Sequence, residues 1–297
     1  TKAGTVTATR SGDGAISASS SDANVAAVSV NGTTITITGK NSGTATITVK
    51  CAEGTNHTAP ANKTVSVTVK AANPTLADND PSTIKEAAQS GQAANLWSAG
   101  DKVPIAVNGK VGSLSINGTY YAFILGFNHN SSIEGGNSIH FQFGKNASGT
   151  DIAFVDSEYG SSAAFRMNTS NTNSGGWEGS YMRKTICPAF LAALPAAWQN
   201  VIVACTKYSD NRGGGSDNAS YVTATQDKIW LLAEFEVFGT RYWANSAEKN
   251  YQKQYDYYKN GNSRVKYKHN ATGTACYWWL RSVDATGSSA FGLVYTG

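Results

Sequence analysis

The sequence TITITGKNSGTATITVK at residues 34–50 decides the fold of the first part of the chain. Isoleucine and valine alternate with threonine on both sides of a Gly-rich and Asn-rich turn at residues 39–43, and the alternation returns at residues 65–69. Period-two patterns of this kind predict short antiparallel strands with one buried face. From Thr1 to about Ala71 the chain has no Trp, Tyr, Phe, Leu or Met. We expect about six or seven strands here, in a small all-β sandwich.

The order of these segments resembles the bacterial immunoglobulin-like domain of group 2. The matching pieces are residues 17–50 and the strand KTVSVTVK at 63–70, with the loop 51–62 between them, and GTATITV at 43–49 is the most specific part. The resemblance implies an Ig-like spacer or stalk, as on secreted, surface and phage-tail proteins, that carries no chemistry. Another small β-sandwich is the alternative.

A change in composition divides the chain. Residues 1–71 form the expected spacer, 72–81 a linker with prolines at both ends, and 82–297 a second domain in which aromatic residues appear from Trp97 onward. Asp80-Pro81 predicts the start of a short helix with a Thr83…Glu86 capping pair. The second domain mixes helical and alternating patterns, so its predicted class is α+β with mainly antiparallel strands.

Several elements of the second domain can be placed from the sequence. Residues 102–130 predict three strands with Asn-Gly turns at 108–109 and 117–118. Residues 181–194 predict a helix with a kink at Pro188, and 247–258 a Tyr-rich helix or an ordered loop. The remaining predicted strands are 138–145, 151–160, 200–208, 228–239, 275–283 and 289–297.

Six ordered blocks carry a second resemblance: residues 100–109, 121–130, 139–145, 167–183, 227–239 and 277–282. Together they are similar to a domain of uncharacterised function common in gut Firmicutes and their phages. That domain resembles the C-type lectin fold of formylglycine-generating enzymes and of the variable proteins of diversity-generating retroelements. In those variable proteins a rigid scaffold displays diversified C-terminal residues that bind targets. Related domains continue to a closing strand, so we expect that strand either to be missing after Gly297 or to be supplied in some other way.

The C-terminal segment after YWWL is small, polar and Gly-rich, with isolated tyrosines, which is the composition of adaptable binding loops. The residues expected to contact a ligand are Tyr277, Val283, Asp284, Ala285, Thr286, Ser288, Ser289, Leu293 and Tyr295. The residues expected to build the scaffold are Trp177, Arg183, Trp278, Trp279 and Arg281. Trp177 as an exposed sugar-stacking platform is the alternative for that side chain.

The sequence contains little that is typical of a catalytic or metal-binding site. We therefore expect no catalytic residues, no metal and no cofactor. The four histidines lie in unlike contexts without a close pair. Glu234 and Glu236, one of the carboxylate pairs that could serve a glycosidase, are expected on the solvent or loop-facing side of a strand. The four cysteines form no C-x-x-C pair, which favours buried thiols and leaves a Cys187–Cys205 bridge open. The loop 209–220 has the only cluster suited to calcium, and we expect it to be a flexible surface loop.

Charge and hydropathy limit the partners. The net charge is +4, which is too small to imply a polyanion, and the basic, Tyr-rich run at 241–269 is expected to be a solvated face rather than a nucleic-acid site. No apolar run is long enough for membrane insertion. Because Thr1 is preceded by neither a methionine nor a signal peptide, we expect a fragment or a processed product.

The sequence therefore predicts a non-enzymatic adhesin, or receptor-binding protein, with a diversified C-terminal surface. Its expected partner is a protein or glycan on a host or bacterial cell, and its expected location is extracellular, on a virion (phage tail or decoration) or a bacterial surface. A structural decoration protein that contacts other virion subunits is the alternative, and a glycosidase or an oxidase is a third.

Overall fold

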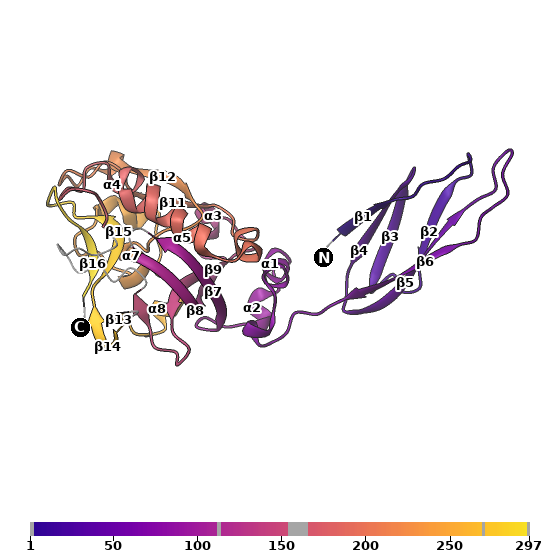
Figure 1. The fold of residues 1–297 in the computed structure, drawn as a ribbon. Coiled ribbons are helices and arrows are strands. Elements are labelled where there is room, and N and C mark those ends of the chain that lie inside the picture. Colours follow the sequence, from indigo (N-terminus) through magenta and orange to yellow (C-terminus); the bar gives the residue numbers. More distant parts are fainter. Residues whose placement is uncertain (1–2, 112–113, 154–165, 269–270, 296–297) are drawn as a thin grey trace. The chain divides into compact units, whose positions relative to one another are not determined.

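The computed structural model describes residues 3–111, 114–153, 166–268 and 271–295. The chain divides into two compact units, Thr1–Asn73 and Pro74–Gly297 (Figure 1). It is β-rich from β1 to β9 and mixed α+β after that. Residues 151–160, predicted as a strand, are described only as far as Ala153, and the rest of that prediction lies outside the described residues.

The first unit consists of two three-stranded antiparallel sheets. One has the order β1 (Ala3–Thr7), β4 (Thr34–Gly39), β3 (Ala26–Asn31), and the other β2 (Ile16–Ser20), β5 (Gly43–Cys51), β6 (Lys63–Val69). Ala26 of one sheet packs with Ala45 and Ile47 of the other in a small core. The strands predicted from the alternating threonines are present, with Gly32 in the left-handed region at φ 60° between β3 and β4.

The second unit begins with short helices: η1 (Leu76–Asp78), α1 (Pro81–Gln89) and α2 (Ala93–Leu96). Leu76 is buried, so part of the segment expected as a linker packs into this unit. Helix α1 starts at Pro81 as predicted, but its cap is not the Thr83…Glu86 pair. Asp80 caps it, because its side chain accepts hydrogen bonds from the backbone amides of Ser82 and Thr83.

A three-stranded antiparallel sheet follows, in the order β7 (Lys102–Val111), β8 (Leu114–Phe127), β9 (Ile139–Lys145). The predicted Asn-Gly turns are wrong. Asn108 pairs with Asn117 in the middle of β7 and β8, and pairing continues to Val111 and Leu114. The two Asn-Gly dipeptides lie opposite each other in one long hairpin instead of at its turns.

Shorter strands complete the unit: the hairpin β11 (Cys205–Asp210) and β12 (Val222–Asp227), the sheet β10 (Ile152–Ala153), β13 (Lys266–Lys268), β14 (Ala271–Cys276), and the hairpin β15 (Trp278–Val283) and β16 (Phe291–Val294). The short helices are α3 (Ser131–Glu134), α4 (Gly176–Gly179), η2 (Met182–Ile186), α5 (Cys187–Ala193), α6 (Ala196–Gln199), η3 (Ala219–Tyr221), α7 (Glu234–Phe238), η4 (Ser246–Asn250) and α8 (Asp256–Lys259).

Two helical segments differ from the prediction. The predicted 181–194 helix has a π-helical turn, η2, directly before α5. Pro188, near the start of α5, has no N–H to donate into the preceding turn, which explains the irregular geometry. Residues 228–239 do not form a strand. They contain α7, because the Glu236 side chain accepts the Ala233 amide at 2.9 Å and Gly239, at φ 72°, ends the helix.

The main core of the second unit joins β8, α7, α8 and β15. Phe123, Val237, Tyr255, Tyr258 and Leu280 are buried together in it. Cys187 and Cys205 are free thiols, so the disulfide that the sequence left open is not formed. Among the described residues, no helix has the length and apolar character needed to cross a bilayer.

Candidate functional site

The hairpin of β15 and β16 carries the predicted contact residues at its two ends. Trp278 pairs with Val294 at one end and Val283 with Phe291 at the other. At about 3.3 Å per residue, the strand separates these ends by roughly 17 Å. Tyr277 and Tyr295 therefore lie at one end, with their rings 5.2 Å apart, and residues 284–289 at the other. The nine residues do not form one continuous patch.

The exposure of the predicted contact residues differs from one to the next. Thr286, Ser288, Ser289, Tyr277 and Tyr295 are exposed, and Asp284 and Leu293 are half-buried. Val283 and Ala285 are buried, with 1% and 4% of their surface exposed. Their assignment as contact residues is wrong, because Val283 belongs to the paired end of the hairpin and both side chains point into the interior.

One buried side chain, that of Asn173, makes hydrogen bonds to the backbone of the loop at residues 284–290. Asn173 is completely buried, and its amide nitrogen lies 3.2, 2.7 and 3.0 Å from the carbonyl oxygens of Asp284, Gly287 and Ala290. Its backbone amide donates to Ser288 O at 2.9 Å. Buried carbonyls that are satisfied in this way fix the backbone of a loop.

The loop 209–220, which we expected to be flexible, supports the same region. Asp210 is buried and accepts the backbone amides of Arg212 and Gly213 at 3.0 and 2.8 Å. Gly213 has φ 66°, and a Cβ there would lie 2.0 Å from Asn173 O. Only glycine fits this position. The glycine at position 213 therefore follows from close packing against Asn173.

A second braced loop lies next to the first. The carboxylate of Glu234, itself 3% exposed, accepts the backbone amides of three successive residues, Tyr242, Trp243 and Ala244. The Ala285 amide donates to Trp243 O at 2.9 Å and joins the two loops. The side chains of Tyr242 and Trp243 remain 59% and 56% exposed.

These two loops form what we call the contact surface, defined by Tyr242, Trp243, Thr286, Ser288 and Ser289. Its backbone is fixed by buried hydrogen bonds, whereas its side chains project into water. Large aromatic side chains on a fixed backbone lose little entropy on binding, and hydroxyl groups beside them adapt to polar partners. The arrangement suits recognition of another molecule.

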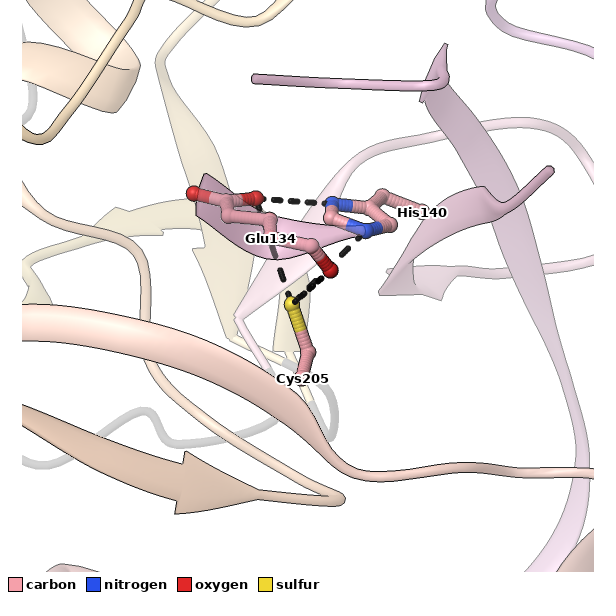
Figure 2. A group of neighbouring side chains, drawn as sticks. All are labelled: Glu134, His140 and Cys205. Atoms are coloured by element: carbon pink, nitrogen blue, oxygen red, sulfur yellow. Dashed lines mark hydrogen bonds and ion pairs between the residues drawn. The ribbon is translucent and has the colours of Figure 1, made fainter. Parts of the chain in front are cut away.

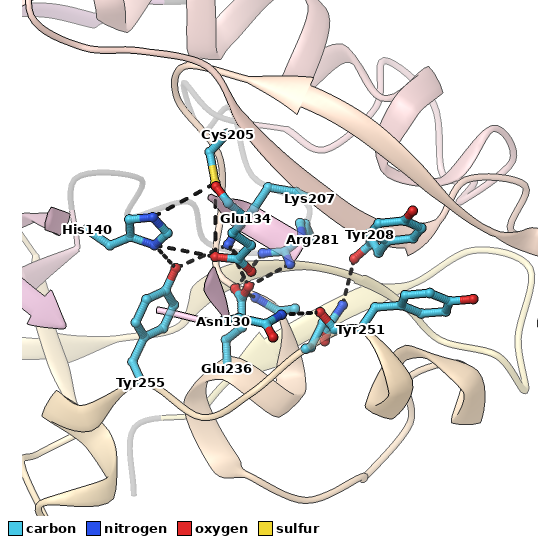
Figure 3. A network of polar contacts seen from close by, with 12 residues as sticks. Asn130, Glu134, His140, Cys205, Lys207, Tyr208, Glu236, Tyr251, Tyr255 and Arg281 are labelled. Atoms are coloured by element: carbon cyan, nitrogen blue, oxygen red, sulfur yellow. Dashed lines mark hydrogen bonds and ion pairs between the residues drawn. The ribbon is translucent and has the colours of Figure 1, made fainter. Parts of the chain in front are cut away.

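A buried network of charges includes Arg281 of β15, the strand that leads into the loop at residues 284–290 (Figure 3). The Arg281 guanidinium binds both carboxylate oxygens of Glu236, at 2.5 and 2.8 Å. Lys207 binds Glu236 at 2.9 Å and Glu134 at 3.0 Å. Two buried cations, Lys207 and Arg281, are thus paired with two buried carboxylates. The strand β15 is fixed by this network in the position from which loop 284–290 starts.

The expected solvent-side placement of Glu234 and Glu236 is wrong. Both are buried, since α7 directs Glu236 to Arg281 and Lys207 and Glu234 to the amides of residues 242–244. Each carboxylate is already held by several partners, which disfavours a role as a glycosidase acid or base.

Glu134, His140 and Cys205 lie close together at the edge of the network (Figure 2). His140 Nδ1 is 3.5 Å from Glu134 Oε2, and Cys205 Sγ is 3.9 Å from His140 Nε2. No pattern in the sequence indicated this group, or the proximity of the His129 and His140 rings, whose centroids lie 5.8 Å apart. Sulfur, imidazole and carboxylate are ligands that zinc accepts.

The electrostatics of this group favour a neutral, structural role. Burial lowers the pKa of His140 to about 3 and raises the pKa of Cys205 to about 12. Both groups are therefore uncharged near neutral pH, and the thiol is not a ready nucleophile. Lys207 already binds Glu134, so a metal ion would have to compete with an ammonium group inside the protein.

Glu248 gives the network a testable pH dependence. It is fully buried and accepts bonds from the Asp210 amide, the Ser282 hydroxyl and the Gln252 amide. Burial raises its pKa from 4.5 to about 7. The folded chain keeps this proton where the unfolded chain releases it, so this contribution to the free energy of unfolding falls as pH rises from 4.5 to 7.

We expect Glu248→Gln to remove that contribution. The histidines act in the opposite direction, because burial lowers the pKa of His129 to about 4, so the two chains must be compared at each pH. The free energy of unfolding in urea, wild type minus variant, should decrease between pH 4.5 and pH 7. A difference that stays constant across this range would show that Glu248 is not held protonated.

The expected scaffold residues lie as follows. Trp177 is completely buried, and its indole N–H donates to Asp227 at 3.0 Å, so it is no exposed stacking platform. Arg183 binds the other oxygen of Asp227 at 2.6 Å. Trp278 is buried and Trp279 half-buried, and Arg281 is the centre of the charged network.

Sequence reasoning did not single out Tyr242 and Trp243, the two aromatic residues of the contact surface. Both lie at the start of the basic, Tyr-rich run 241–269, which was interpreted as a solvated face. The signal was the pair of adjacent large aromatics there. Their exposure depends on Glu234, whose carboxylate accepts backbone amides eight to ten positions further along the chain. A hydrogen bond of this kind leaves no periodic pattern in the sequence.

The comparisons with known proteins give one match. Residues 151–297 match the model of a domain of unknown function, DUF6273. No curated protein matches the chain, and no solved structure does. The C-terminal part of this chain, which includes the contact surface, thus matches the DUF6273 model and is preceded by a β-rich region.

Proposed function

We propose that this chain is a non-enzymatic binding protein that attaches to a partner on a cell surface, bacterial or host, through its contact surface. The observation that carries the proposal is the contrast between backbone and side chains in two adjoining loops. Buried Asn173 and Glu234 fix the loops, while two large aromatics and three hydroxyl side chains face water.

The proposal includes a spacer and a binding module. Two three-stranded sheets around a small shared core support an Ig-like spacer role for the first unit. A terminal hairpin that presents a braced loop supports a lectin-like display role for the second. The setting we propose is a phage tail or virion, or a bacterial surface.

Only the exposed positions of the contact surface are suited to diversification. Of the nine C-terminal residues predicted from the sequence, Thr286, Ser288 and Ser289 are exposed on the braced loop. Surface side chains without buried partners can change with little effect on stability. Val283 and Ala285 cannot vary freely, since a larger or polar side chain would enter the core.

The test measures binding of the fluorescently labelled chain to a panel of intact bacterial and epithelial cells. We expect Tyr242→Ala/Trp243→Ala and Thr286→Ala/Ser288→Ala/Ser289→Ala each to weaken cell binding about tenfold or more. Their melting temperatures should stay within about 2 °C of wild type. Protease or periodate treatment of the cells then distinguishes a protein partner from a glycan.

The matched control is Tyr277→Ala/Tyr295→Ala at the far end of the same hairpin, where two exposed tyrosines are removed. This variant should bind cells as the wild type does. Wild-type binding by both contact-surface variants, with loss of binding in the far-end variant, would place the site elsewhere and contradict the proposal.

A further inference from the structure

The second unit contains an apolar cavity of about 780 Å³ that is separate from the contact surface. Helix α1, strand β9, helix α5 and the segments 198–205 and 228–232 contribute to its wall. Aromatic rings line much of it: Phe141, Phe143, Phe190, Trp198, Trp230 and Trp278. Cavities of this size and character hold small apolar molecules in other proteins.

The charges around the cavity are unbalanced. Among its described lining residues are three lysines, Lys85, Lys228 and Lys266, and one carboxylate, Glu134. Glu134 is already bound by Lys207 at 3.0 Å. The wall therefore has an excess of positive charge, which favours an anionic ligand.

Lys266 is the most unusual of these lysines. It is 2% exposed, and among the described residues its Nζ has no hydrogen-bond partner. The Asp151 carboxylate lies 3.8 Å away but binds Lys145 at 2.9 Å. Lys266 is one of the residues that line the cavity, and its Nζ lies over the ring of Trp278, 5.1 Å from the ring centroid.

A buried ammonium group without hydrogen bonds is unfavourable unless a partner supplies them. Burial accordingly lowers the pKa of Lys266 to about 8. A ligand carboxylate next to Nζ would supply both the charge and the acceptor oxygens, while an alkyl chain would fill the aromatic-lined space and remove its apolar surface from water.

We propose that the cavity binds a fatty acid, with its carboxylate on Lys266 Nζ and its chain along the aromatic rings. The ligand is bound without covalent chemistry. The residues that line the cavity do not include those of the contact surface, so the proposal does not depend on cell attachment.

The test is calorimetric titration of the whole chain with monomeric dodecanoate and, separately, with dodecanol. We expect saturable one-to-one binding of dodecanoate to the wild type. Lys266→Met keeps the size of the side chain and removes its charge, so it should weaken dodecanoate binding about tenfold or more and change dodecanol binding less than about twofold.

Two further variants locate the site. Ala88→Trp, on the α1 wall of the cavity, should weaken both ligands, whereas Lys184→Met, an exposed lysine of the same unit, should weaken neither. Saturable binding of dodecanoate to the wild type is a readout that does not depend on whether a variant folds. No saturable dodecanoate binding, or wild-type dodecanoate affinity in Lys266→Met, would overturn the proposal.

Discussion

Arg281→Met should lower the free energy of unfolding by about 3–5 kcal/mol, because it removes one partner of a fully buried ion pair. The Arg281 guanidinium satisfies both oxygens of Glu236 and also donates to Leu231 O and to the Ser209 hydroxyl. Methionine fills similar space but removes these donors, so that, among the described residues, Glu236 keeps only Lys207 and the Ala233 amide as partners. Urea unfolding followed by circular dichroism measures the loss.

Arg241→Met is the matched control. Arg241 also pairs with a carboxylate, Asp217 at 3.0 Å, but both side chains are 38% exposed. Water and salt screen such a pair, so its loss should cost less than about 1 kcal/mol. Equal losses for the two variants would mean that the network around Arg281 does not support the second unit.

Asn173→Ala should have the second-largest effect and should affect both stability and binding. It leaves the carbonyls of Asp284, Gly287 and Ala290 without their shared donor, and the Gly214 amide without its acceptor. Unsatisfied buried polar groups cost about 1–3 kcal/mol each, with some of this recovered as the loop relaxes. We expect a loss of about 2–3 kcal/mol in urea unfolding.

The same variant should bind cells at least about tenfold more weakly, because the hydroxyl side chains of the 284–290 loop lose their fixed positions. Asn171→Ala is the control: the same residue type two positions away, but exposed. It should keep wild-type stability and cell binding. If Asn173→Ala instead kept full binding with a disordered loop, the braced backbone would be unnecessary for recognition.

The sequence predicted the first unit well because its signal is local. Threonine alternates with valine or isoleucine through β4, β5 and β6, and period two follows directly from the geometry of a strand with one buried face. The second unit follows a composition change that is equally visible in the sequence. These features need no knowledge of distant partners.

The errors in the second unit come from tertiary context. Asn108 and Asn117 each precede glycine, a local hairpin signal, but the long pairing of β7 with β8 overrides it. Residues 228–239 have the apolar run of a buried strand. Yet Glu234 and Glu236 are helical because their carboxylates reach partners at 242–244, 207 and 281.

The candidate site was predictable only in part for the same reason. Alternation suggests that about half of the side chains of a terminal strand are buried, but it does not say which half. Val283 and Ala285 were expected to be exposed and are buried. The brace formed by Asn173 acts over more than one hundred positions. No pattern in a single sequence marks such a contact.

The central claim is that the loops of the contact surface have a fixed backbone that carries solvent-exposed side chains. Amide hydrogen exchange of the whole chain, read by mass spectrometry at residues 242–244 and 284–285, tests this directly. We expect these amides to exchange about one hundredfold or more slowly than in an unstructured peptide, since buried Glu234 and backbone carbonyls accept their hydrogens. Exchange at the rate of an unstructured peptide would contradict the claim.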